Sequence, residues 1–189
     1  MLINDKKRHQ DIISKDEQDG FMLAISNGVK AIMDELIPGG NLLIQSDLSV
    51  LYSEKTGKEQ QLHFDYHPLE LYASNSYGVI VFLEDNSSLV VLNGTKKETV
   101  QCNRGDVIVF RGDKCHAGAE YEYCDNLRFH YYFDSPDSTR KEGETYIKDW
   151  FGPQLEEKQS ITNKRKRSDE QKLELKEKNI KNLNKRFKK

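Results

Sequence analysis

The stretch Gln61-Leu-His63-Phe-Asp65 combines an imidazole and a carboxylate within a segment that we predict to be a strand over residues 61–66. In a β-strand, side chains two positions apart point to the same face of the sheet. His63 and Asp65 are therefore expected to lie side by side, with Phe64 on the opposite face. Side chains of these two types, placed in this way, can share one metal ion.

A second histidine, His116, stands in a context that also suits a ligand. The turn residues Gly112 and Asp113 lead into it, and the small residues Ala117 and Gly118 after it let a ligand or a neighbouring backbone come close. Two histidines and one carboxylate form the facial triad that holds Fe(II) on one side and leaves the other positions open. Open positions are what a catalytic metal needs, because substrate and O2 must bind there.

Arg128 lies twelve residues after His116, in the apolar and aromatic run 127–133. Alternation in a strand places Arg128, His130 and Tyr132 on one face, which fits an enclosed polar cavity. The planar guanidinium can grip a carboxylate through two parallel hydrogen bonds. Simpler alternatives remain open at this point. Arg128 can face water and pair with a surface acid, and His63 can be a strand histidine bonded to a carbonyl.

Residues 42–134, about half of the chain, resemble the double-stranded β-helix core of the Fe(II)/2-oxoglutarate-dependent dioxygenases. The order and spacing are similar to the phytanoyl-hydroxylase-like and prolyl-hydroxylase-like branches of that family. The matching pieces are Gln61–Asp65, Gly78–Asp85, Leu89–Gly94, Gly105–Phe110, His116–Gly118 and Asn126–His130.

The resemblance implies a role for each candidate residue. His63, Asp65 and His116 would be the catalytic iron ligands, and Arg128 would bind the C5 carboxylate of 2-oxoglutarate. Tyr52, eleven residues before His63, would assist Arg128. The implied cofactors are Fe(II), 2-oxoglutarate as cosubstrate, and O2. The implied reaction is hydroxylation or demethylation of a substrate that the sequence does not identify. We rank a protein side chain first, a nucleobase second and a small metabolite third.

The element pattern predicts a mainly β protein with a double-stranded β-helix, or jelly-roll, fold. Apolar residues recur at helical spacing from Phe21 to Leu36, and Pro38-Gly39-Gly40 ends this helix, which is expected to pack on the outside of the barrel. Short strands at regular intervals favour a jelly roll over a βαβ sheet. The eight predicted strands span residues 42–52, 61–66, 77–84, 88–93, 97–102, 107–111, 115–119 and 126–133.

Charge divides the chain near Gly152-Pro153, where the turn residues break the pattern. Residues 155–189 carry thirteen Lys and Arg against six Asp and Glu, a net of +7, while residues 1–154 carry a net of −9. We therefore expect a helical extension at 1–40, a catalytic core at 41–152 and a charged tail, helical or disordered, at 153–189. The cluster Lys164–Arg167 suits nuclear import or nucleic-acid contact, and a solvated tail is the plainer alternative.

Other features narrow the class of protein. The sequence has no 18-residue apolar run and no apolar segment near Met1 of the signal-peptide kind, so we expect a soluble, intracellular protein without a membrane partner. Cys102, Cys115 and Cys124 lack the spacing of a disulfide framework or a zinc site. The sequence does not indicate an oligomeric state.

Two rival functions stay open. The first is a cupin-like protein that binds a metal or a small ligand without oxygenase chemistry, although only His67 and His130 are spare as extra ligands. The second is a nucleic-acid-binding protein in which the β domain is a scaffold and the basic tail binds.

Deleting residues 155–189 is expected to leave the fold and the turnover of 2-oxoglutarate intact, because this segment lacks an apolar face large enough to belong to a core. Location or nucleic-acid affinity should change instead. Thermal unfolding of the truncated chain is the measurement. Loss of a cooperative transition would show that the tail is part of the folded core.

Overall fold

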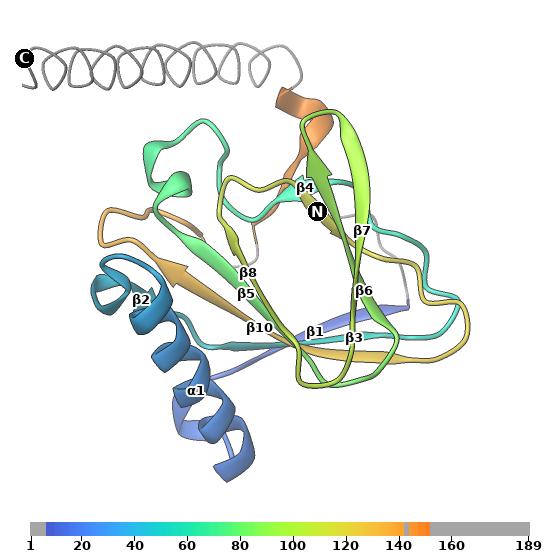
Figure 1. Ribbon diagram of the computed structural model, residues 1–189, viewed down its shortest axis with the longest axis horizontal. Coiled ribbons are helices and arrows are strands. Elements are labelled where there is room, and N and C mark those ends of the chain that lie inside the picture. The colour runs from blue at the N-terminus through green and yellow to red at the C-terminus, as the bar shows by residue number, and fades with distance from the viewer. Residues whose placement is uncertain (1–6, 142–143, 152–189) are drawn as a thin grey trace, which may run out of the picture. The chain divides into compact units, whose positions relative to one another are not determined.

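The computed structural model describes residues 7–141 and 144–151, and within them the chain forms two antiparallel sheets (Figure 1). In the larger sheet the strand order is β1-β3-β10-β5-β8, and β2 also pairs with β10. The smaller sheet has the order β11-β4-β9-β6-β7. The larger sheet consists of β1 (Arg8–Ile13), β2 (Ile44–Gln45), β3 (Leu48–Ser53), β5 (Tyr77–Phe82), β8 (Val107–Arg111) and β10 (Asn126–Asp134). The smaller consists of β4 (His63–Phe64), β6 (Ser87–Asn93), β7 (Lys96–Cys102), β9 (His116–Gly118) and β11 (Tyr146–Ile147).

The predicted jelly-roll class with an N-terminal helix is confirmed. Each predicted strand has a counterpart, although the segment 42–52 divides into β2 and β3. Two strands were not predicted. β1 lies in the region expected to hold only a helix and pairs with β3, and β11 pairs with β4. The predicted tail, 153–189, lies outside the described residues.

Helix α1 (Gly20–Leu36) follows the predicted pattern closely. Its N-cap is Asp19, whose carboxylate accepts a hydrogen bond from the Met22 amide at 2.8 Å and so satisfies one of the free amides of the first turn. Four short 3₁₀ helices complete the described elements: η1 (Lys15–Glu17), η2 (Gly40–Leu42), η3 (Leu71–Ser74) and η4 (Lys148–Phe151). No helix in the described part of the chain is long and apolar enough to cross a membrane.

The larger sheet has two faces with different roles. One face packs against α1, where Val29 and Met33 of the helix meet Phe129, Tyr131 and Phe133 of β10 in one apolar cluster. The Ser26 hydroxyl of the helix also contacts the Tyr131 hydroxyl at 3.0 Å, so this buried polar group is satisfied. The opposite face of the sheet looks toward the smaller sheet.

A second apolar cluster lies between the two sheets. It joins Ile80, Phe82 and Phe110 of the larger sheet to Leu89 and Cys102 of the smaller one. Because β10 alternates, Arg128 and His130 lie on this inner face while Phe129 and Tyr131 face the helix. The space between the two sheets therefore holds the polar side chains of Arg128 and His130 next to this apolar cluster.

Two apolar residues of α1 differ in their exposure. Met33 is fully buried between the helix and the larger sheet, whereas Leu36 is 66% exposed. Met33→Ala should lower the free energy of unfolding by about 2–5 kcal/mol, because it leaves a cavity between the helix and the sheet. Leu36→Ala is the matched control and should change it by less than about 0.5 kcal/mol. Urea denaturation of both variants measures the difference. Equal effects would mean that α1 does not pack on the sheet as described.

Candidate metal centre and anion pocket

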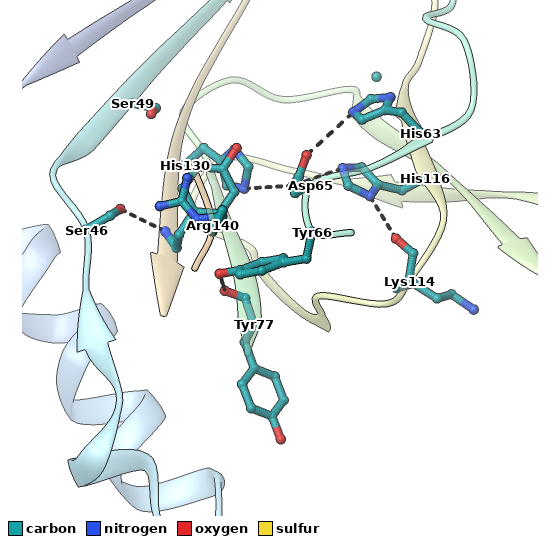
Figure 2. Close-up of polar contacts among 12 residues, drawn as sticks. Ser46, Ser49, His63, Asp65, Tyr66, Tyr77, Lys114, His116, His130 and Arg140 are labelled. Carbon is teal, nitrogen blue, oxygen red and sulfur yellow. Dashed lines mark hydrogen bonds and ion pairs between the residues drawn. The ribbon is translucent and has the colours of Figure 1, made fainter. Parts of the chain in front are cut away.

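Two short strands of the smaller sheet bring the predicted ligands together. β4 pairs with β9 in antiparallel register, with His63 directly opposite His116, and the two rings lie 4.7 Å apart between centroids. Asp65 follows β4 by one residue and shares a face with His63. All three residues are at most 5% exposed. The structure therefore assembles His63, Asp65 and His116 from two segments far apart in the sequence, with the Asp65 carboxylate facing both rings (Figure 2).

The atoms that face one another are suited to a metal ion. The Nε2 atom of His63 lies 3.7 Å from Asp65 Oδ1, and the Nε2 atom of His116 lies 3.5 Å from Asp65 Oδ2. One donor atom from each of the three residues lies within 4.8 Å of the other two. Asp65 Oδ2 is buried and has no hydrogen-bond partner.

Backbone carbonyls set the protonation of both imidazoles. His63 Nδ1 lies 2.8 Å from the Gln61 carbonyl, and His116 Nδ1 lies 3.1 Å from the Lys114 carbonyl. A carbonyl can only accept a hydrogen bond, so each Nδ1 carries a proton, and in the neutral imidazole each Nε2 then presents a lone pair. Burial also lowers the pKa of His63 to about 4, which keeps this imidazole neutral at pH 7.

With both imidazoles in this neutral form, two lone pairs and a carboxylate converge without any proton between them. Such an arrangement is electrostatically unfavourable by itself and becomes favourable when a cation lies among the three groups. Neutral imidazole and carboxylate are the ligand types of the facial triad, so the residues fit a divalent iron site. Among the described residues, no fourth His, Cys, Asp or Glu belongs to this cluster.

Arg128 lies in the same enclosure and is 3% exposed. Its Nη1 donates to the Tyr121 hydroxyl and its Nη2 to the Ser53 hydroxyl, both at 3.1 Å, while Nε has no partner. No carboxylate of residues 7–141 or 144–151 lies within ion-pair distance of the guanidinium. Burial lowers the pKa of Arg128, which means that its charge is costly here. A bound anion would offset this cost.

Tyr52 borders the same cavity as Arg128, but its hydroxyl is bonded to another group. Its register partner on β10 is Leu127, whereas Arg128 pairs with Leu51, so the Tyr52 and Arg128 side chains leave opposite faces of the sheet. The Tyr52 hydroxyl instead donates to Asp125 Oδ2 at 2.6 Å. Tyr52 and His63 lie in different strands, and the loop between β3 and β4 breaks the alternation. Spacing alone therefore could not fix the direction of this side chain.

Sequence reasoning missed the groups that contact Arg128. Ser53 is 1% exposed and Tyr121 is 4% exposed. Tyr121 lies in a single bridge with Gly57 rather than in a strand, so no periodic pattern marks it. Ser53 ends β3, and the alternation of this strand could have placed it beside Arg128 once the pairing with β10 was known.

The two groups of residues open onto one cavity of about 580 Å³, which is within the usual size of a small-ligand site. Its walls include His63, Asp65 and His116 at one place and Ser53 and Arg128 at another. A ligand in this cavity can therefore meet a metal ion and a buried guanidinium at the same time.

Comparison with known proteins identifies the fold. No family model and no curated protein matches the sequence. Among solved structures, the chain is similar to a prolyl hydroxylase of Trichoplax adhaerens in complex with a peptide of hypoxia inducible factor, at 13% identity and a TM-score of 0.55. The match covers 68% of this chain and 63% of the hydroxylase chain, so the chain spans less than two thirds of that relative's length.

Two further structures show the same similarity. HygX of Streptomyces hygroscopicus, solved with nickel, 2-oxoglutarate and hygromycin B, is 11% identical with a TM-score of 0.53, over 74% of this chain and 75% of HygX. The carbocyclase SnoK of nogalamycin biosynthesis is 13% identical with a TM-score of 0.57, over 72% and 67%. At these identities the comparisons establish the fold, a jelly roll, and nothing further.

His116→Ala should abolish or greatly weaken the binding of Mn(II), an inert substitute for Fe(II), because it removes one of three ligands. The loss should exceed the roughly 10- to 100-fold that removal of a ligand's supporting partner costs. Calorimetric titration of the purified chain is the measurement. His9→Ala, which removes an exposed histidine bonded to Glu54, is the control and should bind like wild type. Wild-type affinity in His116→Ala would refute the metal site.

Proposed function

We propose that this chain is an Fe(II)/2-oxoglutarate-dependent oxygenase, in which His63, Asp65 and His116 hold the iron and Arg128 holds the cosubstrate. The observation that carries the proposal is the joint presence, in one cavity, of three converging metal-ligand atoms and a buried arginine without an acidic partner among the described residues. Either feature alone is compatible with a protein of another class. Together they match a ligand that chelates a metal at one end and carries a carboxylate at the other.

The fold supports this proposal. HygX was solved with nickel and 2-oxoglutarate bound, and a viral collagen prolyl hydroxylase of similar fold, with a TM-score of 0.52, was solved with 2-oxoglutarate. Nickel in such a structure stands in for Fe(II). The likeness to these proteins is one of fold, and the residues of this chain supply the remaining argument.

The side chains around Arg128 give it a fixed direction. The Tyr121 hydroxyl donates to the Ser88 carbonyl at 3.0 Å and accepts from Arg128 Nη1, so it holds one edge of the guanidinium. Ser53 holds the other nitrogen. A guanidinium fixed in this way loses little conformational freedom when it forms charge-assisted hydrogen bonds to a carboxylate. We assign it to the C5 carboxylate of 2-oxoglutarate.

Bound Fe(II), with 2-oxoglutarate and O2, supplies the oxidation of a substrate C–H bond, coupled to decarboxylation of 2-oxoglutarate to succinate. The protein supplies position and a dry environment. His63 and His116 present neutral nitrogen ligands because their Nδ1 protons are held by backbone carbonyls. The apolar residues Ile80 and Leu89 line the same cavity and limit the entry of water.

For the prime substrate, we favour a protein side chain. The support is the similarity of fold to a prolyl hydroxylase that was solved with a peptide. HygX, of similar fold, was solved with the small molecule hygromycin B, so a small metabolite is the competing class. The basic cluster Lys164–Arg167 supports nucleic-acid contact or nuclear import as a further proposal, separate from the catalytic centre.

Arg128→Ala should weaken 2-oxoglutarate binding by roughly 10- to 100-fold, since a charged hydrogen-bonded pair contributes about 1.5–3 kcal/mol. Arg128→Lys should recover only part of this, because an ammonium group cannot reproduce the two-pronged contact. Calorimetry with 2-oxoglutarate on the Mn(II)-loaded chain measures both. Mn(II) affinity itself should stay the same, because Arg128 is not a ligand.

Two tyrosines provide matched controls for this experiment. Tyr121→Phe removes the hydroxyl that contacts Arg128 and should weaken 2-oxoglutarate binding by less than Arg128→Ala. Tyr52→Phe removes a hydroxyl that donates to Asp125 and not to any group of Arg128, and it should leave that affinity unchanged. If Arg128→Ala binds 2-oxoglutarate as tightly as wild type, the cosubstrate assignment fails, and a metal-binding protein without oxygenase chemistry becomes the better description.

A further inference from the structure

A third histidine lies beside the metal site and belongs to no role assigned so far. His130 is 4% exposed and follows Arg128 by two positions on the inner face of β10. Its Nε2 atom is buried and has no hydrogen-bond partner. The nearest acidic atom is Asp65 Oδ2, at 3.6 Å, and this oxygen has no hydrogen-bond partner either (Figure 2). A potential donor and an unsatisfied acceptor thus face each other just beyond hydrogen-bonding distance.

The geometry separates His130 from the ligands. His63, Asp65 and His116 each offer an atom within 4.8 Å of the other two, and His130 is outside this set. His63 and His116 come from the smaller sheet, whereas His130 comes from the larger sheet and approaches Asp65 from the other side. Its Nε2 is directed at the carboxylate, so His130 can contact the ligand Asp65 without contacting the ion.

The surroundings of His130 hold its ring in place. The Phe110 ring lies 6.2 Å and the Tyr132 ring 4.4 Å from it between centroids. Strand β10 is paired on both sides in this region, with Ser49 of β3 and Ile80 of β5 as the register partners of His130. A ring fixed in this way can define the orientation of a carboxylate that follows a two-residue strand.

We propose that His130 is a positioning residue that donates a hydrogen bond from Nε2 to Asp65 Oδ2 and so leaves Oδ1 to bind the metal ion. This inference rests on the metal site of the proposed function. A carboxylate with one oxygen held by His130 binds the ion through the other oxygen alone. His130 therefore keeps Asp65 from occupying a second position that substrate or O2 requires.

The two buried atoms without a hydrogen-bond partner, Asp65 Oδ2 and His130 Nε2, support this role. When a cation is bound, Asp65 Oδ2 would remain buried without a donor unless His130 supplied one, because His63 and His116 direct lone pairs, and not protons, at Asp65. Residues that orient a metal ligand typically change metal affinity by about 10- to 100-fold when they are removed. His130 is the neighbour of Asp65 in the described structure that has an unused ring nitrogen in this direction.

The test compares two substitutions of similar size. His130→Phe keeps a planar ring and removes the donor, whereas His130→Gln carries an amide nitrogen that can reach the position of Nε2. We expect His130→Phe to weaken Mn(II) binding by roughly 10- to 100-fold, and His130→Gln to recover most of the loss. Calorimetry gives both affinities. The visible spectrum of the Co(II)-loaded chain should keep its band positions in His130→Gln, which still holds Asp65 Oδ2, and should shift in His130→Phe, where Asp65 is free to bind through both oxygens.

Stability separates positioning from a merely structural role. The metal-free His130→Phe chain should unfold at a temperature no lower than wild type, because the substitution removes a buried polar atom without a partner. A structural role would lower that temperature and leave the affinity of the folded chain alone. His130→Leu repeats the comparison with a side chain that lacks the ring and fits within the same space.

Two results would overturn the inference while leaving the metal site intact. One is wild-type Mn(II) affinity in both His130→Phe and His130→Leu. The other is equal weakening in His130→Phe and His130→Gln with shifted Co(II) bands in both, which would make His130 a fourth ligand. Failure of the wild-type chain to bind Mn(II) would instead overturn the proposed function, and with it this inference.

Discussion

The cross-strand pair His63–His116 is the constraint on which the site depends. It is formed by a two-residue strand, β4, and a three-residue strand, β9, which are among the shortest in the described structure. A slip of one residue in this pairing would turn one imidazole to the other face of the sheet. β11 on one side and β6 on the other flank the pair and limit such a slip. The smaller sheet thus holds the His63 and His116 side chains in a fixed relative position.

Strand β10 connects the site to the packing of the larger sheet. Its alternate residues serve two different cores, with Phe129, Tyr131 and Phe133 packed under α1 and Arg128 and His130 facing the cavity. Packing of α1 on one face of β10 therefore fixes the position of the strand, and with it the direction of Arg128 and His130 on the opposite face. The buried guanidinium, the orphan imidazole nitrogen and the candidate metal ligands all occur where the two sheets meet.

Much of this arrangement could be predicted from the sequence, because it depends on local alternation. The pair His63 and Asp65, the β10 face that carries Arg128, and helix α1 all follow from period-two or helical patterns. The rest depends on which strands become neighbours. Tyr52 was placed by its distance from His63. The direction of its side chain depends on the register between β3 and β10, which the sequence of neither strand determines alone. Tyr121 contacts Arg128 from a segment without a repeating pattern, and β1 was missed because its residues, Arg8–Ile13, are mostly exposed.

Arg8 gives this unpredicted strand a further significance. Its guanidinium donates to the Lys58 and Ala119 carbonyls, both at 2.6 Å, and to the Ser53 hydroxyl at 3.1 Å. Ser53 is also the hydroxyl that holds Arg128. One side chain near the start of the chain therefore joins three distant segments and borders the cavity. The smallest folded unit that keeps this cavity must accordingly include Arg8, and a tag or partner attached just before it would sit close to the cavity wall.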